Sequence, residues 1–233
     1  MSDTPIDVFI DLPSFPGPVQ AGRLWSHFRK GRESASFEYN KEWLANPHRF
    51  ALEPLLPLAD GTFHTNPGQS VFGAIGDSTP DRWGRILMRR AELARARTAN
   101  ESPHTLSELD YLLRVNDEAR QGALRFSQDG GQSFCAPPGS TPIPPLVNLS
   151  RLLHAADHFC RDDENAEDLR LLLAPGSSLG GARPKASVKD KKGNLCIAKF
   201  PRYDDEYNVV AWEAVALTLA SKAGLQVPRF ELE

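Results

Sequence analysis

The chain has 233 residues, of which 40% are hydrophobic and 24% charged, a composition typical of one large globular domain or two modest ones and unlike that of a disordered segment. The 27 Lys and Arg against 30 Asp and Glu exclude a protein that binds nucleic acid over its whole surface. No stretch approaches the roughly 18 apolar residues of a membrane-spanning helix, and the N-terminus lacks the features of a secretory signal. We therefore expect a cytoplasmic protein with no membrane partner.

The N-terminal part of the sequence has the alternating pattern of β-strands. Apolar and aromatic residues alternate in AGRLWSHF (residues 21–28) and SASFEY (residues 34–39), on either side of the turn sequence RKGRE, which predicts a β-hairpin. Residues 46–80 are rich in Pro and Gly and are expected to be irregular, apart from a short buried helical turn in SVFGAIG.

The sequence STPDRWGRILMRRAELARAR predicts a helix from about Pro80 to Arg97, because its apolar residues recur at helical spacing. Thr79 is the expected cap, and Pro80 suits the first helical position. The arginines of this helix outnumber its acids, Asp81 and Glu92, and we favour a solvated face over a docking surface for an acidic partner. The arginines are Arg82, Arg85, Arg89, Arg90, Arg95 and Arg97.

Two short elements follow this helix. Thr105 and Glu108 have the spacing of a capping box, which predicts a helix over TLSELDYLLR. The sequence QGALRFS (residues 121–127) predicts a strand.

A linker is predicted at residues 129–146, because this stretch contains more prolines and glycines than a regular element tolerates. It separates an N-terminal domain over residues 1–128 from a second domain over residues 147–233.

The second domain begins with a predicted helix, VNLSRLLHAADHF (residues 147–159), that carries His154 and His158 one turn apart. No third ligand accompanies this pair, so we expect no metal site. The acidic run RDDENAED (residues 161–168) is interpreted as a solvated loop. The three cysteines are too far apart for a disulfide framework or paired metal ligands and are expected to be reduced; they are Cys135, Cys160 and Cys196.

A glycine-rich loop, GSSLGGARPK (residues 176–185), precedes two predicted strands, KASVKD (residues 185–190) and LCIAKF (residues 195–200). Glycines let backbone N–H groups point toward a bound anion, as in phosphate-binding loops. Many hairpin turns also contain adjacent glycines and bind nothing, so the loop alone leaves both interpretations open.

Lys199 and Glu213 favour the phosphate-binding interpretation. Strand alternation puts Lys199 on the same face as Ile197, where a cation needs either a partner or a path to water. The next predicted helix covers residues 204–224, with Asp204 or Asp205 as its cap and Gly224 after its end. Glu213 falls on or beside the apolar stripe of this helix and is expected to pair, because an unpaired buried carboxylate is costly. The stripe consists of Val209, Val210, Ala216, Leu217 and Ala220.

Loop, strand lysine and helix glutamate occur in the order of a protein-kinase small lobe. The segments SSLGGARPKASV, IAKFP, DEY and WEAVALTLASKAGL resemble the HipA family, the kinase toxins of bacterial toxin–antitoxin modules. GDSTPDRWGR and NDEARQGALRF resemble the N-terminal subdomain of the same family. The resemblance implies an α+β fold, with a β-rich N-terminal subdomain followed by a partial kinase-like small lobe.

The resemblance also implies roles for individual residues. Lys199 would bind phosphate, Glu213 would orient Lys199, and Ser178, beside Ser177, would be an autophosphorylation site that silences the kinase. The nucleotide-phosphate loop would consist of Gly180, Gly181, Ala182, Arg183, Pro184 and Lys185. In the family the cofactors are ATP and Mg²⁺, the substrate is a protein such as an aminoacyl-tRNA synthetase, and a HipB-like DNA-binding antitoxin is the partner. Contact with DNA is expected only through that antitoxin.

The sequence departs from the family pattern after Lys199. Only 34 residues remain, and none supplies the catalytic or Mg²⁺-binding aspartate that phosphoryl transfer requires. The end, VPRFELE, has the pattern of an unfinished strand, so we expect a truncated kinase that is inactive alone. The alternatives are a non-catalytic module that docks an antitoxin or a separate kinase subunit, and a decayed gene product that does not fold stably.

Overall fold

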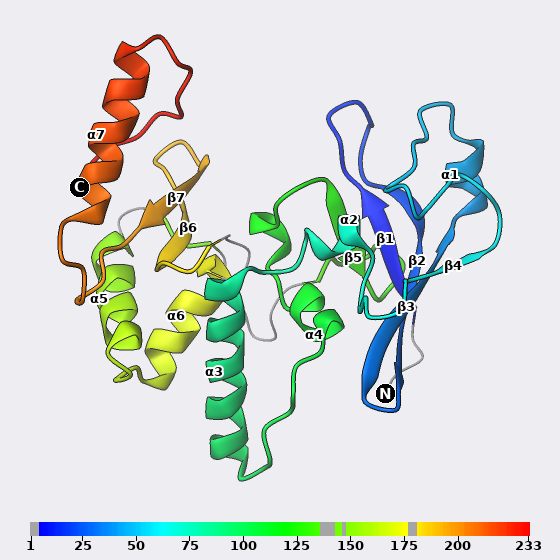
Figure 1. The fold of residues 1–233 in the computed structure, drawn as a ribbon, viewed down its shortest axis with the longest axis horizontal. Coiled ribbons are helices and arrows are strands. Elements are labelled where there is room, and N and C mark those ends of the chain that lie inside the picture. Colours follow the sequence, from blue (N-terminus) through cyan, green and yellow to red (C-terminus); the bar gives the residue numbers. More distant parts are fainter. Residues whose placement is uncertain (1–4, 136–142, 146–147, 177–180) are drawn as a thin grey trace.

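Two antiparallel sheets and the helices between them form the computed structural model, which describes residues 5–135, 143–145, 148–176 and 181–233 (Figure 1). The described strands are β1 (Ile6–Ile10), β2 (Val19–Arg29), β3 (Arg32–Tyr39), β4 (Thr62–His64), β5 (Leu124–Ser127), β6 (Lys185–Lys189) and β7 (Leu195–Lys199). The described helices are α1 (Lys41–Ala45), α2 (Gly73–Gly76), α3 (Arg82–Ala99), α4 (Glu108–Leu113), the 3₁₀ helix η1 (Asp117–Ala119), α5 (Leu149–Cys160), α6 (Ala166–Gly176) and α7 (Val209–Lys222). The fold is α+β, as predicted.

The larger sheet has the strand order β4-β3-β2-β1-β5. The predicted hairpin is confirmed as β2 and β3, whose last pair joins Arg29 to Arg32. Lys30 and Gly31 form the turn between them with φ angles of 50° and 75°, the left-handed conformation that two-residue hairpins favour. The core of the N-terminal part contains fully buried aromatic side chains from the sheet, Phe37 and Phe126, and from the helical segments packed on it, Trp43 and Phe72.

Helix α3 is confirmed, but its predicted cap is wrong. The helix begins at Arg82 and Asp81 takes the N-cap position, so Pro80 lies before the helix. The Thr79 hydroxyl instead donates to the Gly76 carbonyl at 2.7 Å. A cap must have extended backbone immediately before the first helical residue, and Thr79 lies too early for that.

The predicted capping box of α4 is shifted by two residues. Ser107, not Thr105, is the N-cap, and its hydroxyl accepts the backbone N–H of Asp110 at 3.1 Å. The carboxylate of Asp110 accepts the backbone N–H of Ser107 at 2.9 Å, which completes the box. Glu108 is free of this role and forms an ion pair with Arg85.

Half of the α3 arginines pair with acids of this chain, which neither sequence interpretation foresaw. Arg85 binds Glu108, Arg95 binds Glu92 within the helix, and Arg90 binds Glu164 with its nitrogen and oxygen 2.7 Å apart. The other three arginines are exposed; they are Arg82, Arg89 and Arg97.

The acidic run at residues 161–168 is a mostly exposed loop over residues 161–165, as predicted, but its end enters α6 and some of its acids form ion pairs. Asp162 and Glu164 both bind Arg90, and Asp168 lies in α6, where its carboxylate is 3.0 Å from Nδ1 of His158. These contacts connect three helices, because Asp162 and Glu164 bind Arg90 of α3, and Asp168 of α6 binds His158 of α5.

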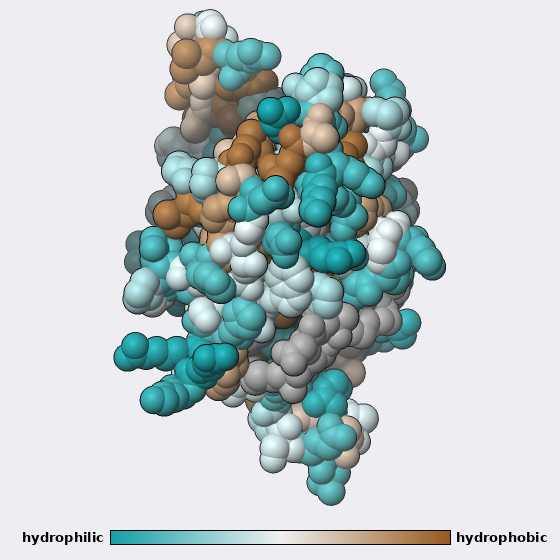
Figure 2. All heavy atoms as spheres, turned by 90° about the vertical axis from the view of Figure 1, so that its right-hand side faces the viewer, coloured by the Kyte–Doolittle hydropathy of each residue, from teal (hydrophilic) through white to brown (hydrophobic). Residues whose placement is uncertain are grey.

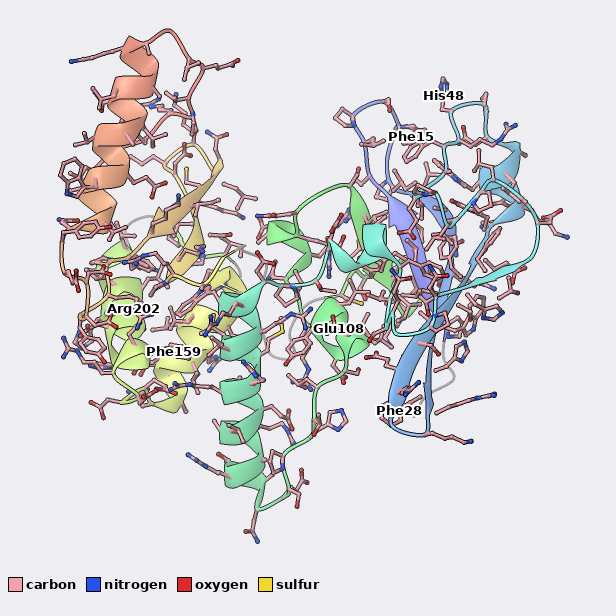
Figure 3. The ribbon with its side chains drawn as sticks, viewed as in Figure 1. Phe15, Phe28, His48, Glu108, Phe159 and Arg202 are labelled. Carbon is pink, nitrogen blue, oxygen red and sulfur yellow. The ribbon has the colours of Figure 1, made fainter. Side chains whose placement is uncertain are left out.

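A second apolar core lies among α3, α5, α6 and β6. Trp83 of α3 packs edge-on against Phe159 of α5, with ring centroids 5.1 Å apart. Phe159 lies in the C-terminal part of the molecule, next to α6 (Figure 3). Leu172 of α6 and Val188 of β6 complete the same cluster. Helix α3 therefore packs with the C-terminal part, although its sequence lies within the predicted N-terminal domain; the domain boundaries remain predictions.

The described ends of the predicted linker pack against both parts of the molecule. Phe134 contacts Phe9 of β1 with ring centroids 5.5 Å apart, and the backbone N–H of Lys189 donates to the Pro144 carbonyl at 2.9 Å. In the ranges that the structure describes, no helix has both the length and the apolar character needed to span a bilayer.

Candidate functional site

The β6–β7 hairpin sets two lysines side by side. Lys185 and Lys199 are direct partners in the antiparallel register, so their side chains share one face of the hairpin. On the opposite face, Ala186 and Phe200 are buried in the second apolar core, as the predicted alternation requires. Like charges directly opposite each other are unfavourable, so this face is suited to an anion.

The predicted pair of Lys199 and Glu213 is confirmed, because the lysine amine and the glutamate carboxylate form an ion pair. The two side chains are 46% and 40% exposed, and an ion pair so accessible to water adds little to stability. Its main effect is to fix the position of the Lys199 amine.

Helix α7 carries Glu213 to this position, but it is built differently from the prediction. Its N-cap is Asn208, whose side chain accepts the backbone N–H of Ala211 at 2.9 Å. Asp204 and Asp205 lie outside the helix, and each forms an ion pair with an arginine. None of the residues of α7 is buried, so the expected burial of its apolar stripe is wrong.

Lys185 connects the loop to this ion pair. Burial is the main reason that the pKa of Lys185 is lowered, Lys199 lowers it further, and Asp81 and Glu213 oppose the shift. A Cβ atom added to Gly181 would lie 2.9 Å from the Lys185 amine, and the φ of +78° at Gly181 also favours glycine. The backbone conformation therefore favours glycine at position 181, and the Lys185 amine lies next to it.

Some of the other predicted loop residues lie in the described part of the chain, and the rest lie outside it. Arg183 forms an ion pair with Asp205, Ala182 is exposed, and the Pro184 carbonyl accepts the Phe200 N–H at 3.0 Å. Gly180, Ser177 and the predicted phosphorylation site Ser178 lie outside the described residues. The structure thus brings together Gly181, Lys185, Lys199 and Glu213, and it turns Arg183 toward Asp205.

The first turn of α3 binds the end of the loop, a contact that the sequence reasoning missed. The carboxylate of Asp81 accepts the backbone N–H of Gly181 at 2.7 Å, and the Trp83 N–H donates to the Gly181 carbonyl at 3.0 Å. The indole N–H of Trp83 donates to the Lys185 carbonyl at 2.9 Å. These partners are about 100 residues apart in sequence, and no local pattern signals such a contact.

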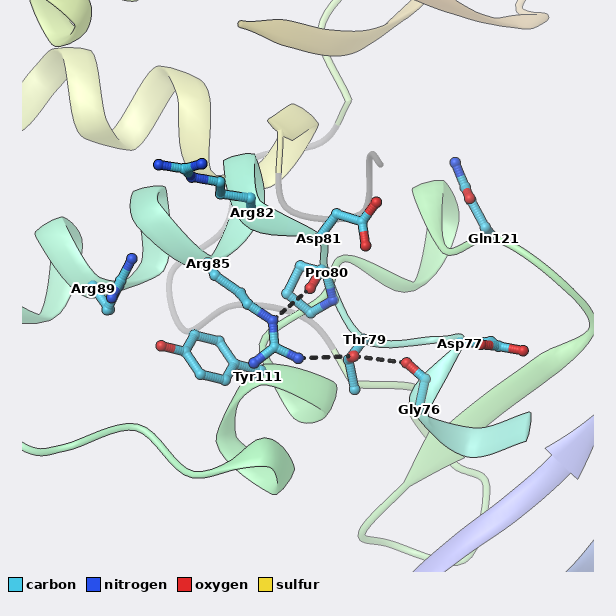
Figure 4. A pocket seen from close by; sticks show the side chains of 10 residues that line it. All are labelled: Gly76, Asp77, Thr79, Pro80, Asp81, Arg82, Arg85, Arg89, Tyr111 and Gln121. Carbon is cyan, nitrogen blue, oxygen red and sulfur yellow. Dashed lines mark hydrogen bonds between the residues drawn. The ribbon is translucent and has the colours of Figure 1, made fainter. Parts of the chain in front are cut away.

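A cavity of about 620 Å³ opens at the N-terminal end of α3 (Figure 4). Arg82, Arg85 and Arg89 line it, and the Arg85 guanidinium donates to the Pro80 carbonyl at 2.8 Å. Among the predicted loop residues that the structure describes, none lines this cavity. Asp81 does, so it lies between the cavity and the loop.

The two neighbouring histidines and the three cysteines lie outside the candidate site. His154 and His158 have ring centroids 4.1 Å apart, but within the described ranges no three His, Cys, Asp or Glu residues are grouped to hold a metal ion. The cysteines are free thiols, as expected. Burial raises the pKa of Cys135 to about 11, which keeps it protonated and unreactive.

Comparison with protein families finds two matches. A family described as the HipA N-terminal domain matches residues 17–127, and one described as the HipA-like C-terminal domain matches residues 177–233. Comparison with curated proteins finds no match. The C-terminal match contains the loop, Lys199 and Glu213, and the N-terminal match contains Asp81 and Trp83.

Proposed function

The chain belongs to the HipA family of toxin–antitoxin proteins, and from this premise we propose that its C-terminal part binds the phosphates of ATP for serine/threonine protein kinase activity. The observation that carries the proposal is the ion pair of Lys199 with Glu213 next to Lys185 and Gly181. A lysine held by a helix glutamate under a glycine turn is the phosphate-binding arrangement of kinase small lobes.

The residues present fit a polyphosphate. Lys185 and Lys199 are paired across the hairpin, so their side chains lie on the same side. Glu213 of α7 adds one carboxylate, which binds the Lys199 amine. The φ of +78° at Gly181 favours glycine, so no side chain stands between the backbone and the Lys185 amine at this position. Lys185 and Lys199 would hold the phosphates, Gly181 would let them approach the backbone, and Glu213 would orient Lys199. ATP, when bound, supplies the phosphoryl group that a kinase transfers.

The described residues fit phosphate but do not form a Mg²⁺ site. No group of three metal-binding side chains occurs within the described ranges, so we derive no step through a metal ion. From family membership we further propose a protein substrate such as an aminoacyl-tRNA synthetase, a HipB-like antitoxin as the partner, autophosphorylation at Ser178 and a cytoplasmic location.

Nucleotide binding by the 233-residue chain tests the proposal. We expect Lys199→Ala to weaken the binding of a fluorescent ATP analogue by about tenfold, because a charge-assisted contact to phosphate is lost. Lys191→Ala is the matched control, since it removes one exposed positive charge from the turn at the other end of the same hairpin. Equal affinities of the two variants would contradict a phosphate site at Lys199.

A second candidate is a binding module for a separate kinase subunit, and the exposed apolar surface of the C-terminal part favours it. Trp212, Leu219 and Leu225 are 61%, 60% and 64% exposed. Apolar side chains are visible at the top of the space-filling view, where α7 and the chain after it lie (Figure 2). Exposed apolar patches of this kind mark interaction surfaces. We expect Leu219→Asp to abolish co-purification with a chain carrying a HipA-type catalytic lobe; retained co-purification would contradict docking at α7.

A further inference from the structure

Asp81 is a helix N-cap that does not cap its own helix. An aspartate at this position normally accepts a backbone N–H from the first turn. Here no such hydrogen bond forms, and the carboxylate instead accepts the N–H of Gly181 at 2.7 Å. In the close-up of Figure 4 the Asp81 carboxylate points away from Arg85.

The Gly181 N–H is one of the groups that a bound phosphate would use. Phosphate loops bind anions through backbone N–H groups and nearby cations. Asp81 already gives this N–H an anionic acceptor, and its charge acts on Lys185, the cation beside the same glycine. A carboxylate and a phosphate cannot both accept from one N–H with good geometry, and two negative charges at that distance repel each other.

We infer that Asp81 competes with the nucleotide phosphates for the Gly181 N–H and so lowers the affinity of the loop for ATP. The inference rests on the proposed nucleotide function and adds a regulatory residue to the same site. Because Asp81 belongs to α3, the affinity of the C-terminal loop then depends on a charge from the N-terminal part of the sequence.

The rest of the junction does not depend on this charge. Trp83 is 2% exposed, and its two N–H groups donate to the carbonyls of Gly181 and Lys185. Its ring also packs against Phe159. These neutral contacts hold α3 against the hairpin whether or not the Asp81 carboxylate accepts the Gly181 N–H, so substitutions at Asp81 leave the fold intact.

Nucleotide affinity of charge variants tests the competition. Asp81→Asn keeps the size of the side chain and removes its charge, and Asp77→Asn is the matched control, an exposed acid at the end of α2 that lines the same cavity. We expect Asp81→Asn to bind a fluorescent ATP analogue about fivefold more tightly, the size expected for removing one solvent-screened charge near a phosphate. Adenosine affinity should stay unchanged in both variants. Unchanged or weaker ATP binding by Asp81→Asn overturns the inference.

A second measurement needs no nucleotide. Amide hydrogen exchange at Gly181 should be faster in Asp81→Ala than in the unmodified chain or in Asp77→Asn, because the acceptor is lost. Equal exchange rates would show that the contact does not protect this N–H and would overturn the inference.

Lys199→Ala separates the two hypotheses. If it weakens ATP binding and Asp81→Asn does not strengthen it, the phosphate site stands and the competition is wrong. If ATP binds no variant, or binds Lys199→Ala normally, the proposed phosphate site is wrong and the competition falls with it.

Discussion

The N-terminal sheet and the β6–β7 hairpin differ in how much of their surface is buried. The five-stranded sheet buries aromatic side chains completely, whereas the hairpin buries its strand β6 and leaves its strand β7 largely exposed with α7 beside it. Helix α7 buries none of its residues. The candidate phosphate-binding groups lie where these two kinds of surface meet, since Lys185 is buried on β6 whereas the side chains of Lys199 and Glu213 are 46% and 40% exposed.

The largest expected effect is on the core of the N-terminal sheet. Phe37 has no exposed surface, so Phe37→Ala should lower the free energy of unfolding by about 3–5 kcal/mol. Leu219→Ala on α7 should change it by less than about 0.5 kcal/mol, because that side chain is already in water. Chemical denaturation of both variants measures the difference. A similar loss at both positions would mean that α7 is covered in solution.

The buried carboxylate of Glu92 should make the stability of the protein depend on pH. Glu92 is 3% exposed, and hydrogen bonds from Arg95, His104 and Arg114 lower its pKa from 4.5 to about 2, with Arg95 contributing most. A pKa lowered by folding stabilises the protein above the unfolded value, and this stabilisation is lost as pH falls from about 4.5 toward 2. The unfolding free energy should therefore fall by about 2 kcal/mol more in the unmodified chain than in Glu92→Gln over this range. Parallel pH profiles would contradict the assignment.

The smallest effect is expected at the exposed carboxylate. Glu213→Gln should change the free energy of unfolding by less than about 1 kcal/mol, because the ion pair with Lys199 is open to water. It should nevertheless weaken ATP binding, since Lys199 is no longer held in place. A large loss of stability with unchanged ATP affinity would assign the pair a structural role.

The local elements of the site follow from the sequence because their signals are local. Alternation predicts β6 and β7, and the glycines predict the turn before them. The sequence also predicts the pairing of Lys199 with Glu213, although the reason given, the cost of an unpaired buried charge, does not hold, because the two side chains are 46% and 40% exposed. The cap positions are less accurate: Asp204 and Asp205 were expected to begin α7, but both pair with arginines and Asn208 caps the helix.

The contacts between distant segments do not follow from the sequence. Nothing in the residues around Asp81 indicates that its carboxylate accepts the N–H of Gly181, and the docking of Trp83 against Lys185 is equally invisible. The exposure of α7 was also missed, because an apolar stripe predicts burial without showing what covers it.

A crystal structure of the chain with a non-hydrolysable ATP analogue tests the central claim most directly. The account predicts phosphate oxygens within hydrogen-bonding distance of the Lys199 amine and the Gly181 N–H, with the Asp81 carboxylate withdrawn from Gly181. Phosphates bound instead among the arginines of the α3 cavity, with Lys199 and Gly181 free of them, would contradict it.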